Sequence, residues 1–327
     1  MIVTQAPFRV SFFGGGTDHP EFFLDEGGIV LGSSINKYCY TTLNPLESNF
    51  FDYNLKVSYS KIELANNVLD IEHNIFRECL RYFNVKQGLS IHNVFDLPSF
   101  SGLGSSSSLT VSFINALEEH LGIPHNSFEL AKKAIHVERN LVKSTVGWQD
   151  QIFAACGGFN LIRFNKNETF TIEPITLDTE FLQEFEDHLL LVYTGIQRES
   201  SLISQAQINR ININRQKLLQ IKEIALHGYN LLLSASDLGE FGKLLHESWL
   251  LKRSFDKNVS TPEMDELYNI ALSNGAFGGK ILGAGGGGFF LFFATPQSQE
   301  KIKNALPSKK CIKIKTSLNG SRSIFKS

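Results

Sequence analysis

The chain is 327 residues long, with 42% hydrophobic residues, 20% charged residues and a formal net charge of -2. This composition is typical of a globular protein with two domains. The nearly balanced charge, without a basic block, excludes a general nucleic-acid-binding surface. We expect no transmembrane helix, because no apolar run reaches about 18 residues, and no N-terminal secretory signal. Scattered cysteines without metal-ligand spacing indicate reduced thiols in a cytoplasmic protein: Cys39, Cys79, Cys156 and Cys311.

Residues 2–13 predict a strand that runs directly into the turn Gly14-Gly15-Gly16-Thr17-Asp18. Arg9 lies inside this strand and Asp18 ends the turn. Loops at strand ends often carry ligand groups on a rigid base, so both residues are candidates for a site. Alternatively, Arg9 faces solvent and Asp18 is an ordinary turn residue.

Further strands are predicted at residues 29–40, 50–59 and 89–96, with a helix at about 67–83. Because the strands cluster and do not alternate regularly with helices, the fold class is α+β.

Residues 97–108 combine a strand end, a glycine turn and a helix start. Gly102 and Gly104 allow the backbone to approach an anion, and the serines that follow leave free N–H groups at the positive end of a helix. The pattern therefore predicts a phosphate-binding loop. A serine-rich capped turn is the alternative.

The next helix begins with Asn126 and Glu129 as a capping box and is expected to continue to about Val142. Glu138 falls on its apolar face, where a carboxylate requires a partner because its burial is costly. Asp150 follows twelve residues later. The two acidic residues suit one Mg²⁺ and one hydroxyl group, although a salt bridge or a helix cap explains each of them as well.

The chain turns polar at residues 165–175, which suggests a boundary between domains at 1–170 and 171–327. Beyond a strand at 189–194, helices are predicted at about 200–236, at 238–253 and from Thr261-Pro262 to Gly275. Lys252 and Arg253 either meet a substrate phosphate or form a solvated helix end. His246 is expected to be a partly buried helix residue, because no second metal ligand stands at the required spacing.

Residues 278–288 form a second glycine-rich stretch, followed by the aromatic run 289–293. No helix follows, so a dinucleotide-binding reading fails, and the Walker A pattern is absent. Four consecutive glycines suggest close approach to another group, while a tight hairpin is the alternative.

Three glycine-bearing motifs, at residues 6–18, 97–108 and 280–288, together resemble the GHMP kinase superfamily. The resemblance spans the chain. The Gly-Gly-Gly-Thr-Asp turn and residues 246–253 and 278–280 are similar to the branch that phosphorylates heptoses and fucose. Other members have Gly-Glu-His where this chain has Gly14-Gly15-Gly16.

This resemblance implies a two-domain fold: an N-terminal domain like domain 2 of ribosomal protein S5, with a left-handed βαβ unit, and a ferredoxin-like C-terminal domain. ATP is expected in the cleft between them. Its phosphates would lie on Pro98, Ser101, Gly102, Leu103, Gly104, Ser105, Ser106 and Ser107.

The resemblance also implies roles for individual residues. Asp150 matches the catalytic aspartate, Arg9 the basic residue beside it, and Ser106 and Glu138 the Mg²⁺ ligands. Candidate substrate contacts are Thr17, Asp18, Gly285, Gly286, Arg198 and Lys252.

The implied activity is ATP-dependent phosphorylation of the C1 hydroxyl of D-glycero-α-D-manno-heptose 7-phosphate, for the synthesis of a nucleotide-activated heptose. The expected partners are the sugar phosphate and ATP, with the chain a monomer or homodimer. The alternatives are a fucose-type or other sugar 1-kinase and, from another class, a non-catalytic sensor of sugar and ATP.

Overall fold

The computed structural model describes residues 1–86, 88–99, 101–196, 204–206, 208–235 and 237–327. In this part of the chain, eight strands form a first sheet in which β12-β1-β2-β5-β3-β4 are adjacent and β6, itself paired with β7, joins β2. These strands are β1 (Ile2–Phe13), β2 (Gly28–Pro45), β3 (Leu55–Ser58), β4 (Ile62–Ala65), β5 (Leu89–Phe95), β6 (Phe159–Phe164), β7 (Phe170–Pro174) and β12 (Arg322–Lys326).

A second, antiparallel sheet has the order β11-β8-β10-β9 in the described residues. It consists of β8 (Leu189–Tyr193), β9 (Ala276–Ile281), β10 (Phe289–Ala294) and β11 (Cys311–Lys313). The predicted aromatic strand is β10, and all six of its residues are buried. Both of its faces are covered because Phe289, Leu291 and Phe293 belong to one core cluster and Phe290 and Phe292 to the other.

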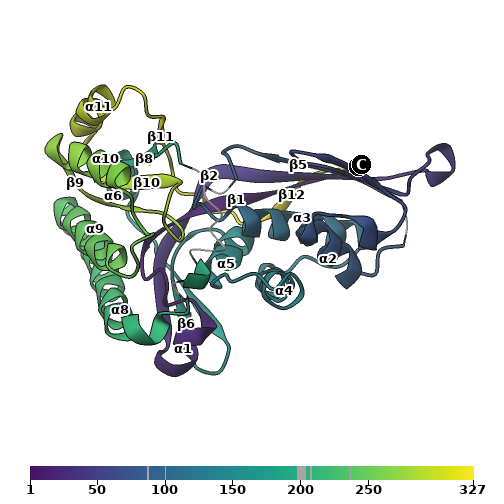
Figure 1. Ribbon diagram of the computed structural model, residues 1–327, viewed down its shortest axis with the longest axis horizontal. Coiled ribbons are helices and arrows are strands. Elements are labelled where there is room, and N and C mark those ends of the chain that lie inside the picture. Colours follow the sequence, from purple (N-terminus) through teal and green to yellow (C-terminus); the bar gives the residue numbers. More distant parts are fainter. Residues whose placement is uncertain (87, 100, 197–203, 207, 236) are drawn as a thin grey trace.

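Helices of the first half lie along one side of the first sheet, and α9–α11 lie by the second sheet (Figure 1). The helices are α1 (Pro20–Glu26), α2 (Asn74–Tyr82), α3 (Ser105–Leu121), α4 (Ser127–His136), α5 (Gln149–Cys156), α6 (Thr179–Asp187), α8 (Ile211–Leu233), α9 (Leu238–Arg253), α10 (Pro262–Ser273) and α11 (Pro296–Ala305), with short turns η1 (Ser48–Phe50), η2 (Val68–Asp70) and η3 (Val137–Leu141).

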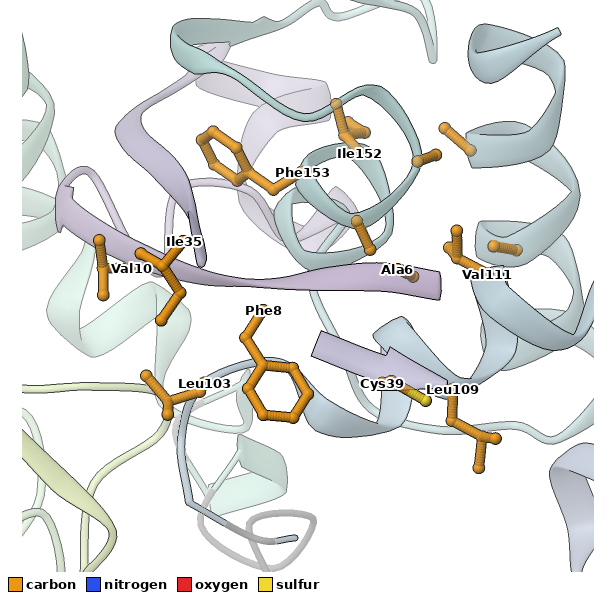
Figure 2. Close-up of a cluster of buried hydrophobic side chains, with 14 of the residues drawn as sticks. Ala6, Phe8, Val10, Ile35, Cys39, Leu103, Leu109, Val111, Ile152 and Phe153 are labelled. Atoms are coloured by element: carbon orange, nitrogen blue, oxygen red, sulfur yellow. The ribbon is translucent and has the colours of Figure 1, made fainter. Parts of the chain in front are cut away.

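The strand β1 is the centre of the main core, since all but one of its residues are buried. Figure 2 shows part of this core: Ala6, Phe8 and Val10 on β1, with Leu103 from the loop before α3, Leu109 from α3, and Ile152 and Phe153 from α5. The predicted phosphate loop and the helix that carries Asp150 are therefore both packed against β1.

Several sequence expectations are confirmed. The Asn126 side chain caps α4 by accepting from the N–H groups of Phe128 and Glu129, and Thr261 caps α10 with Pro262 in its first turn. The α+β class is also confirmed.

Other boundaries differ from the expectation. The helix expected at 67–83 is the shorter α2 preceded by η2, and α4 ends at His136 before the π-helical turn η3. The division at residues 170 and 171 stays a prediction, but β7 and β12, both from the second half, pair within the first sheet. Hydrogen bonding to β1 holds β12 there, and such long-range pairing leaves no local sequence signal.

None of the helices in the described ranges combines the length and apolar character that membrane crossing requires.

Candidate active site

The loop between β5 and α3 leads into a helix start that suits an anion. Gly104, at the N-cap of α3, is left-handed with φ 78° and brings no side chain to cap the helix. The N–H groups of a helix's first turn have no partner inside the helix and lie at the positive end of its dipole. The residues from Gly102 to Ser106 can therefore receive phosphate oxygens through their backbone.

The two glycine-rich motifs 97–108 and 280–288 contact each other through their backbones. A Cβ on Gly102 would lie 2.4 Å from the Leu282 carbonyl oxygen, and one on Gly283 would lie 2.7 Å from the Cα of Gly102. Neither position admits a side chain. The stretch 282–288 is thus a hairpin turn between β9 and β10 that also packs closely on the phosphate loop. Both predictions made for it, a tight hairpin and a close approach to another group, are confirmed.

Glu138 is fully buried next to this loop, and all of its hydrogen-bond donors are neutral. Ser106 Oγ donates to Oε1 over 2.8 Å and Ser107 Oγ donates to Oε2 over 2.7 Å. Thr110 Oγ1 and Gln151 Nε2 complete the set. Burial raises the pKa of Glu138, and the hydrogen bonds from Ser107, Gln151 and Ser106 oppose that rise.

This donor set fits Mg²⁺. The ion prefers oxygen ligands and is usually held by one or two carboxylates together with substrate phosphates and water. Glu138 and Ser106 supply a carboxylate and a hydroxyl oxygen beside the phosphate loop, and within the described residues no salt bridge compensates the charge of Glu138. No group of three or more histidine, cysteine, aspartate or glutamate side chains in those residues could hold a metal ion by itself. Bound phosphates would have to supply the remaining ligands.

Asp150, in the first turn of α5, is held by Arg9 from β1. Arg9 Nε lies 2.7 Å from Oδ1 and Arg9 Nη2 lies 2.8 Å from Oδ2, which is a bidentate ion pair. Arg9 Nη1 also donates to the carbonyl of Gly102 over 2.6 Å, so the same side chain joins Asp150 to the phosphate loop. Burial raises the pKa of Asp150, the charge of Arg9 lowers it, and the nearby carboxylate of Asp18 raises it further, with a net rise.

The described geometry therefore brings Arg9, Asp150, Glu138 and the loop together as the sequence predicts. Comparison with known proteins agrees. The family model for the GHMP kinase N-terminal domain matches residues 66–158, and the model for the C-terminal domain matches residues 230–313. A D-glycero-alpha-D-manno-heptose 7-phosphate kinase of Campylobacter jejuni is 33% identical over 93% of this chain and 93% of its own length.

The chain belongs to the GHMP kinase superfamily.

Solved structures support this assignment. A putative sugar kinase from Campylobacter jejuni is 32% identical, with a TM-score of 0.73, and covers 98% of this chain and 97% of its own. A D-glycero-D-manno-heptose 1-phosphate kinase from Bacteroides thetaiotaomicron has a TM-score of 0.81 at 24% identity, over the full length of both chains. At that identity the second likeness shows the fold alone. The two-domain GHMP kinase fold is thereby confirmed, and the protein is an ATP-dependent sugar kinase with an alcohol acceptor.

In this GHMP kinase the two polar residues that end the first motif, Thr17 and Asp18, are both buried. The Thr17 hydroxyl contacts the carbonyls of Gly14 and Ile29 and accepts from the Ile29 N–H, so it fixes the turn. The Asp18 carboxylate accepts from the N–H groups of Gly16 over 3.0 Å and Gln149 over 3.3 Å. Each carboxylate oxygen keeps further acceptor capacity, which leaves Asp18 able to receive a sugar hydroxyl.

Lys252 is buried, which the solvated-helix-end reading did not anticipate. Its Nζ donates to the carbonyl oxygens of Gly283 and Ile281, while its neighbour Arg253 is half-exposed and paired with Asp265 at 2.7 Å. Burial lowers the pKa of Lys252 to about 7, with a further contribution from Arg9. The solvated reading thus holds only for Arg253.

Two candidate substrate contacts lie in the second glycine-rich stretch. Gly286 donates its N–H to the Val259 carbonyl and Gly285 packs on Val259, so the Gly286 N–H is not free for a substrate.

The remaining candidates take different positions. Ser107 Oγ donates to Glu138 and Ser108 Oγ donates to the Pro7 carbonyl, so both point inward. Leu103 is a core residue whose carbonyl accepts from the Arg9 N–H. Ser101 and Ser105 are buried, Pro98 is exposed, and Arg198 lies outside the described residues. His246, as expected, is a partly buried helix residue, bonded to Tyr268.

Two site residues were missed from the sequence. Lys280 on β9 is buried and donates to the Phe12 carbonyl on β1 over 2.9 Å, which joins the two sheets. Burial lowers its pKa well below the ordinary lysine value, with Lys252 and Arg9 adding to that effect. The second missed residue is Gln151, whose Nε2 is one of the donors to Glu138. The available signal for Lys280 was a charged residue inside a buried strand, as for Arg9, whereas Gln151 follows two other polar residues, Gln149 and Asp150, and gives no such signal.

Proposed function

We propose that this sugar kinase phosphorylates the C1 hydroxyl of D-glycero-α-D-manno-heptose 7-phosphate and so makes the 1,7-bisphosphate of a route to nucleotide-activated heptose. The Arg9–Asp150 pair beside the phosphate loop is the observation that supports it best, because it provides a base next to the phosphate to be transferred. The 33% identity to a heptose 7-phosphate kinase over nearly all of both chains supports the choice of sugar.

In the proposed mechanism, Asp150 receives the proton of the attacking hydroxyl. A base works best when its pKa lies near the operating pH, and burial moves the pKa of Asp150 in that direction. The bidentate contact with Arg9 fixes the carboxylate in place and limits the rise. The N–H groups at the start of α3 bind phosphate oxygens and orient them toward the acceptor.

Glu138 and Ser106 are the residues proposed to hold Mg²⁺. When bound, the ion neutralises charge on the phosphate oxygens. Ser107, Thr110 and Gln151 keep the Glu138 carboxylate oriented for this role.

The substrate 7-phosphate is assigned to Lys252. Two of its N–H groups are directed to carbonyls of the 280–288 motif, which leaves one donor for an anion. Because its pKa is about 7, the ammonium form is lost as the pH rises through neutrality, and the KM for a phosphorylated sugar should rise with it. Lys252→Arg should remove that pH dependence.

One assay tests the proposal: ADP release with heptose 7-phosphate, unphosphorylated heptose, fucose and galactose. We expect the highest kcat/KM for heptose 7-phosphate. Lys252→Ala should lose affinity for that sugar and spare unphosphorylated heptose. Equal losses on both heptoses would refute the role of Lys252, and a higher kcat/KM for fucose would favour the fucose-type alternative.

The sensor alternative predicts ATP binding without turnover. The presence of two bonded pairs beside the same loop, Arg9 with Asp150 and Ser106 with Glu138, favours the enzyme. A cytoplasmic location is part of the proposal and is supported by the four cysteines, all of which are free thiols. Whether the chain is a monomer or a homodimer stays a prediction for sedimentation measurements.

A further inference from the structure

The two carboxylates of the site are joined by a loop that is neither helix nor strand. Glu138 lies in the π-helical turn η3, and residues 143–148 lead from that turn to Asp150 in the first turn of α5. Turns of this kind are rare and often occur at functional sites. The position of Asp150 relative to Glu138 therefore depends on how residues 143–148 are held.

This loop begins in an unfavourable backbone conformation. Lys143 has a φ of 61°, in the left-handed region that residues other than glycine rarely adopt, and the residue is exposed. A strained backbone persists only where the surrounding structure holds it. Contacts made by the rest of the loop must therefore keep it in place.

Arg139, the residue after Glu138, makes such a contact. Its Nη1 donates to the Val146 carbonyl in the middle of the loop, and its Nη2 lies 2.6 Å from Glu21 Oε1 on α1. Only 16% of the Arg139 side chain is exposed. One guanidinium group therefore joins three elements: the turn η3, the loop 143–148 and α1.

The far end of the loop lies against the same part of the molecule. A Cβ on Gly147 would lie 1.8 Å from Asp18 Oδ2, so only glycine fits there. The Trp148 N–H donates to the Asp18 carbonyl over 3.1 Å, and the Trp148 ring meets the Phe23 ring of α1 edge-on, with 4.8 Å between the ring centroids. The loop thus packs on the helix to which Arg139 is bonded.

We propose that Arg139 is a positioning residue for phosphoryl transfer, which holds the loop 143–148 against α1 and thereby sets the place of Asp150 relative to Glu138. A displacement of a reacting group by about 1 Å can lower a rate by about 10²-fold. The two bonds of Arg139 reach the loop and α1, so its effect on the reaction passes through Asp150. This inference rests on the proposed function of Asp150.

The main test is Arg139→Ala, alone and combined with Asp150→Asn, with ADP release from ATP and heptose 7-phosphate as the readout. We expect Arg139→Ala to lower kcat by about tenfold or more. The KM for ATP should stay unchanged, because the N–H groups at the start of α3 do not depend on the loop. In the Asp150→Asn background, Arg139→Ala should lower kcat no further, because residues that act as a unit are not additive.

A second measurement separates positioning from folding stability. Ethylguanidinium added to Arg139→Ala can bond Glu21 and the Val146 carbonyl in place of the lost side chain, and it should restore part of kcat. Ethylammonium is the matched control, since it carries the same charge without the planar, forked donors. A general loss of stability would not distinguish the two ions. If Arg139→Ala does not fold, Arg139→Lys replaces it in both tests, because a single ammonium group cannot reproduce both bonds.

Arg163→Ala is the matched control variant. Arg163 also pairs with a glutamate, Glu173, but on the paired strands β6 and β7, where both side chains are more than one third exposed. This variant should keep the wild-type kcat.

The inference is overturned if Arg139→Ala keeps the wild-type kcat, even at a lower unfolding temperature. It is also overturned if Arg139→Ala costs the same factor in kcat with and without Asp150→Asn, because Arg139 would then act independently of the base. Turnover of another sugar in place of the heptose overturns the proposed substrate only, and the same variants then test the inference on that sugar. If no sugar is turned over, both proposals fall.

Discussion

Two carboxylates lie beside the predicted phosphate loop, Glu138 fully buried and Asp150 largely buried, and their charges are balanced in different ways. Glu138 is fully buried and receives hydrogen bonds from hydroxyl and amide groups, none of which carries a charge. Asp150 keeps one fifth of its side chain exposed and forms a bidentate ion pair with Arg9. Burial raises the pKa of both.

This difference separates the two roles. A buried charge without a counter-charge is costly, so Glu138 gains most when a cation arrives with the nucleotide. Asp150 already has its counter-charge, and its exposed part is free to meet the acceptor hydroxyl. The following predictions test whether the two carboxylates can be told apart in this way.

The largest effect is expected from Asp150→Asn. The amide cannot take the hydroxyl proton, so kcat should fall by about 10²- to 10⁴-fold, while ATP binding measured by calorimetry is kept. Asp265→Asn is the control, because Asp265 also pairs with an arginine, Arg253, but on the half-exposed surface of α9 and α10. Near-normal turnover of Asp150→Asn would remove this residue from the mechanism.

For Glu138→Gln we expect an effect on Mg²⁺. The variant should raise the Mg²⁺ concentration needed for half-maximal activity by about 10- to 100-fold, the range found for groups that support a bound metal. The readout is ADP release in a Mg²⁺ titration at fixed ATP. If the titration is unchanged and only kcat falls, Glu138 acts otherwise than as a metal ligand.

A smaller effect is expected from Arg9→Lys, which keeps the charge but loses the bidentate geometry. Because Arg9 holds the pKa of Asp150 down, its weakening should raise that pKa, and the acidic limb of the kcat/KM profile should move to higher pH. At neutral pH we expect kcat/KM to fall by about tenfold, and to recover as the pH is raised. A loss that is equal at every pH would point to displacement of Gly102 instead.

Much of this site is visible in the sequence because a charged residue in an apolar pattern is conspicuous. Arg9 in a strand and Glu138 on an apolar helix face both follow from hydrophobic periodicity, and the caps at Asn126 and Thr261 follow from local chemistry. These inferences use only neighbours along the chain.

The segments that pack against a helix or strand from elsewhere in the chain cannot be predicted in the same way. The periodicity of α9 does not reveal that the 280–288 motif lies over Lys252, nor that Lys280 reaches Phe12 in the other sheet. The return of β12 to β1 is equally long-range. The difference between Gly14, where a Cβ would overlap the Ile29 carbonyl, and Gly15, where a Cβ would fit, could not be foreseen either, because successive glycines look alike in the sequence and only their contacts separate them.

The smallest expected effect, and the one that separates the two carboxylates most directly, is on stability without nucleotide. The folded state raises the pKa of Glu138 above its unfolded value, so the folded protein binds more protons between those two pKa values. The free energy of unfolding therefore falls as the pH rises through that window.

Glu138→Gln abolishes this fall, and the rotatable hydroxyls of Ser106 and Thr110 can accept from the new amide. At neutral pH the unfolding temperature of the variant should be about 2 °C higher than that of the wild type. This difference in unfolding temperature should disappear at acidic pH. Mg²⁺ with a non-hydrolysable ATP analogue should reverse the order, because it stabilises the wild type more. A wild type that is the more stable protein at every pH, with or without Mg²⁺, would show that the neutral donors alone balance the charge of Glu138.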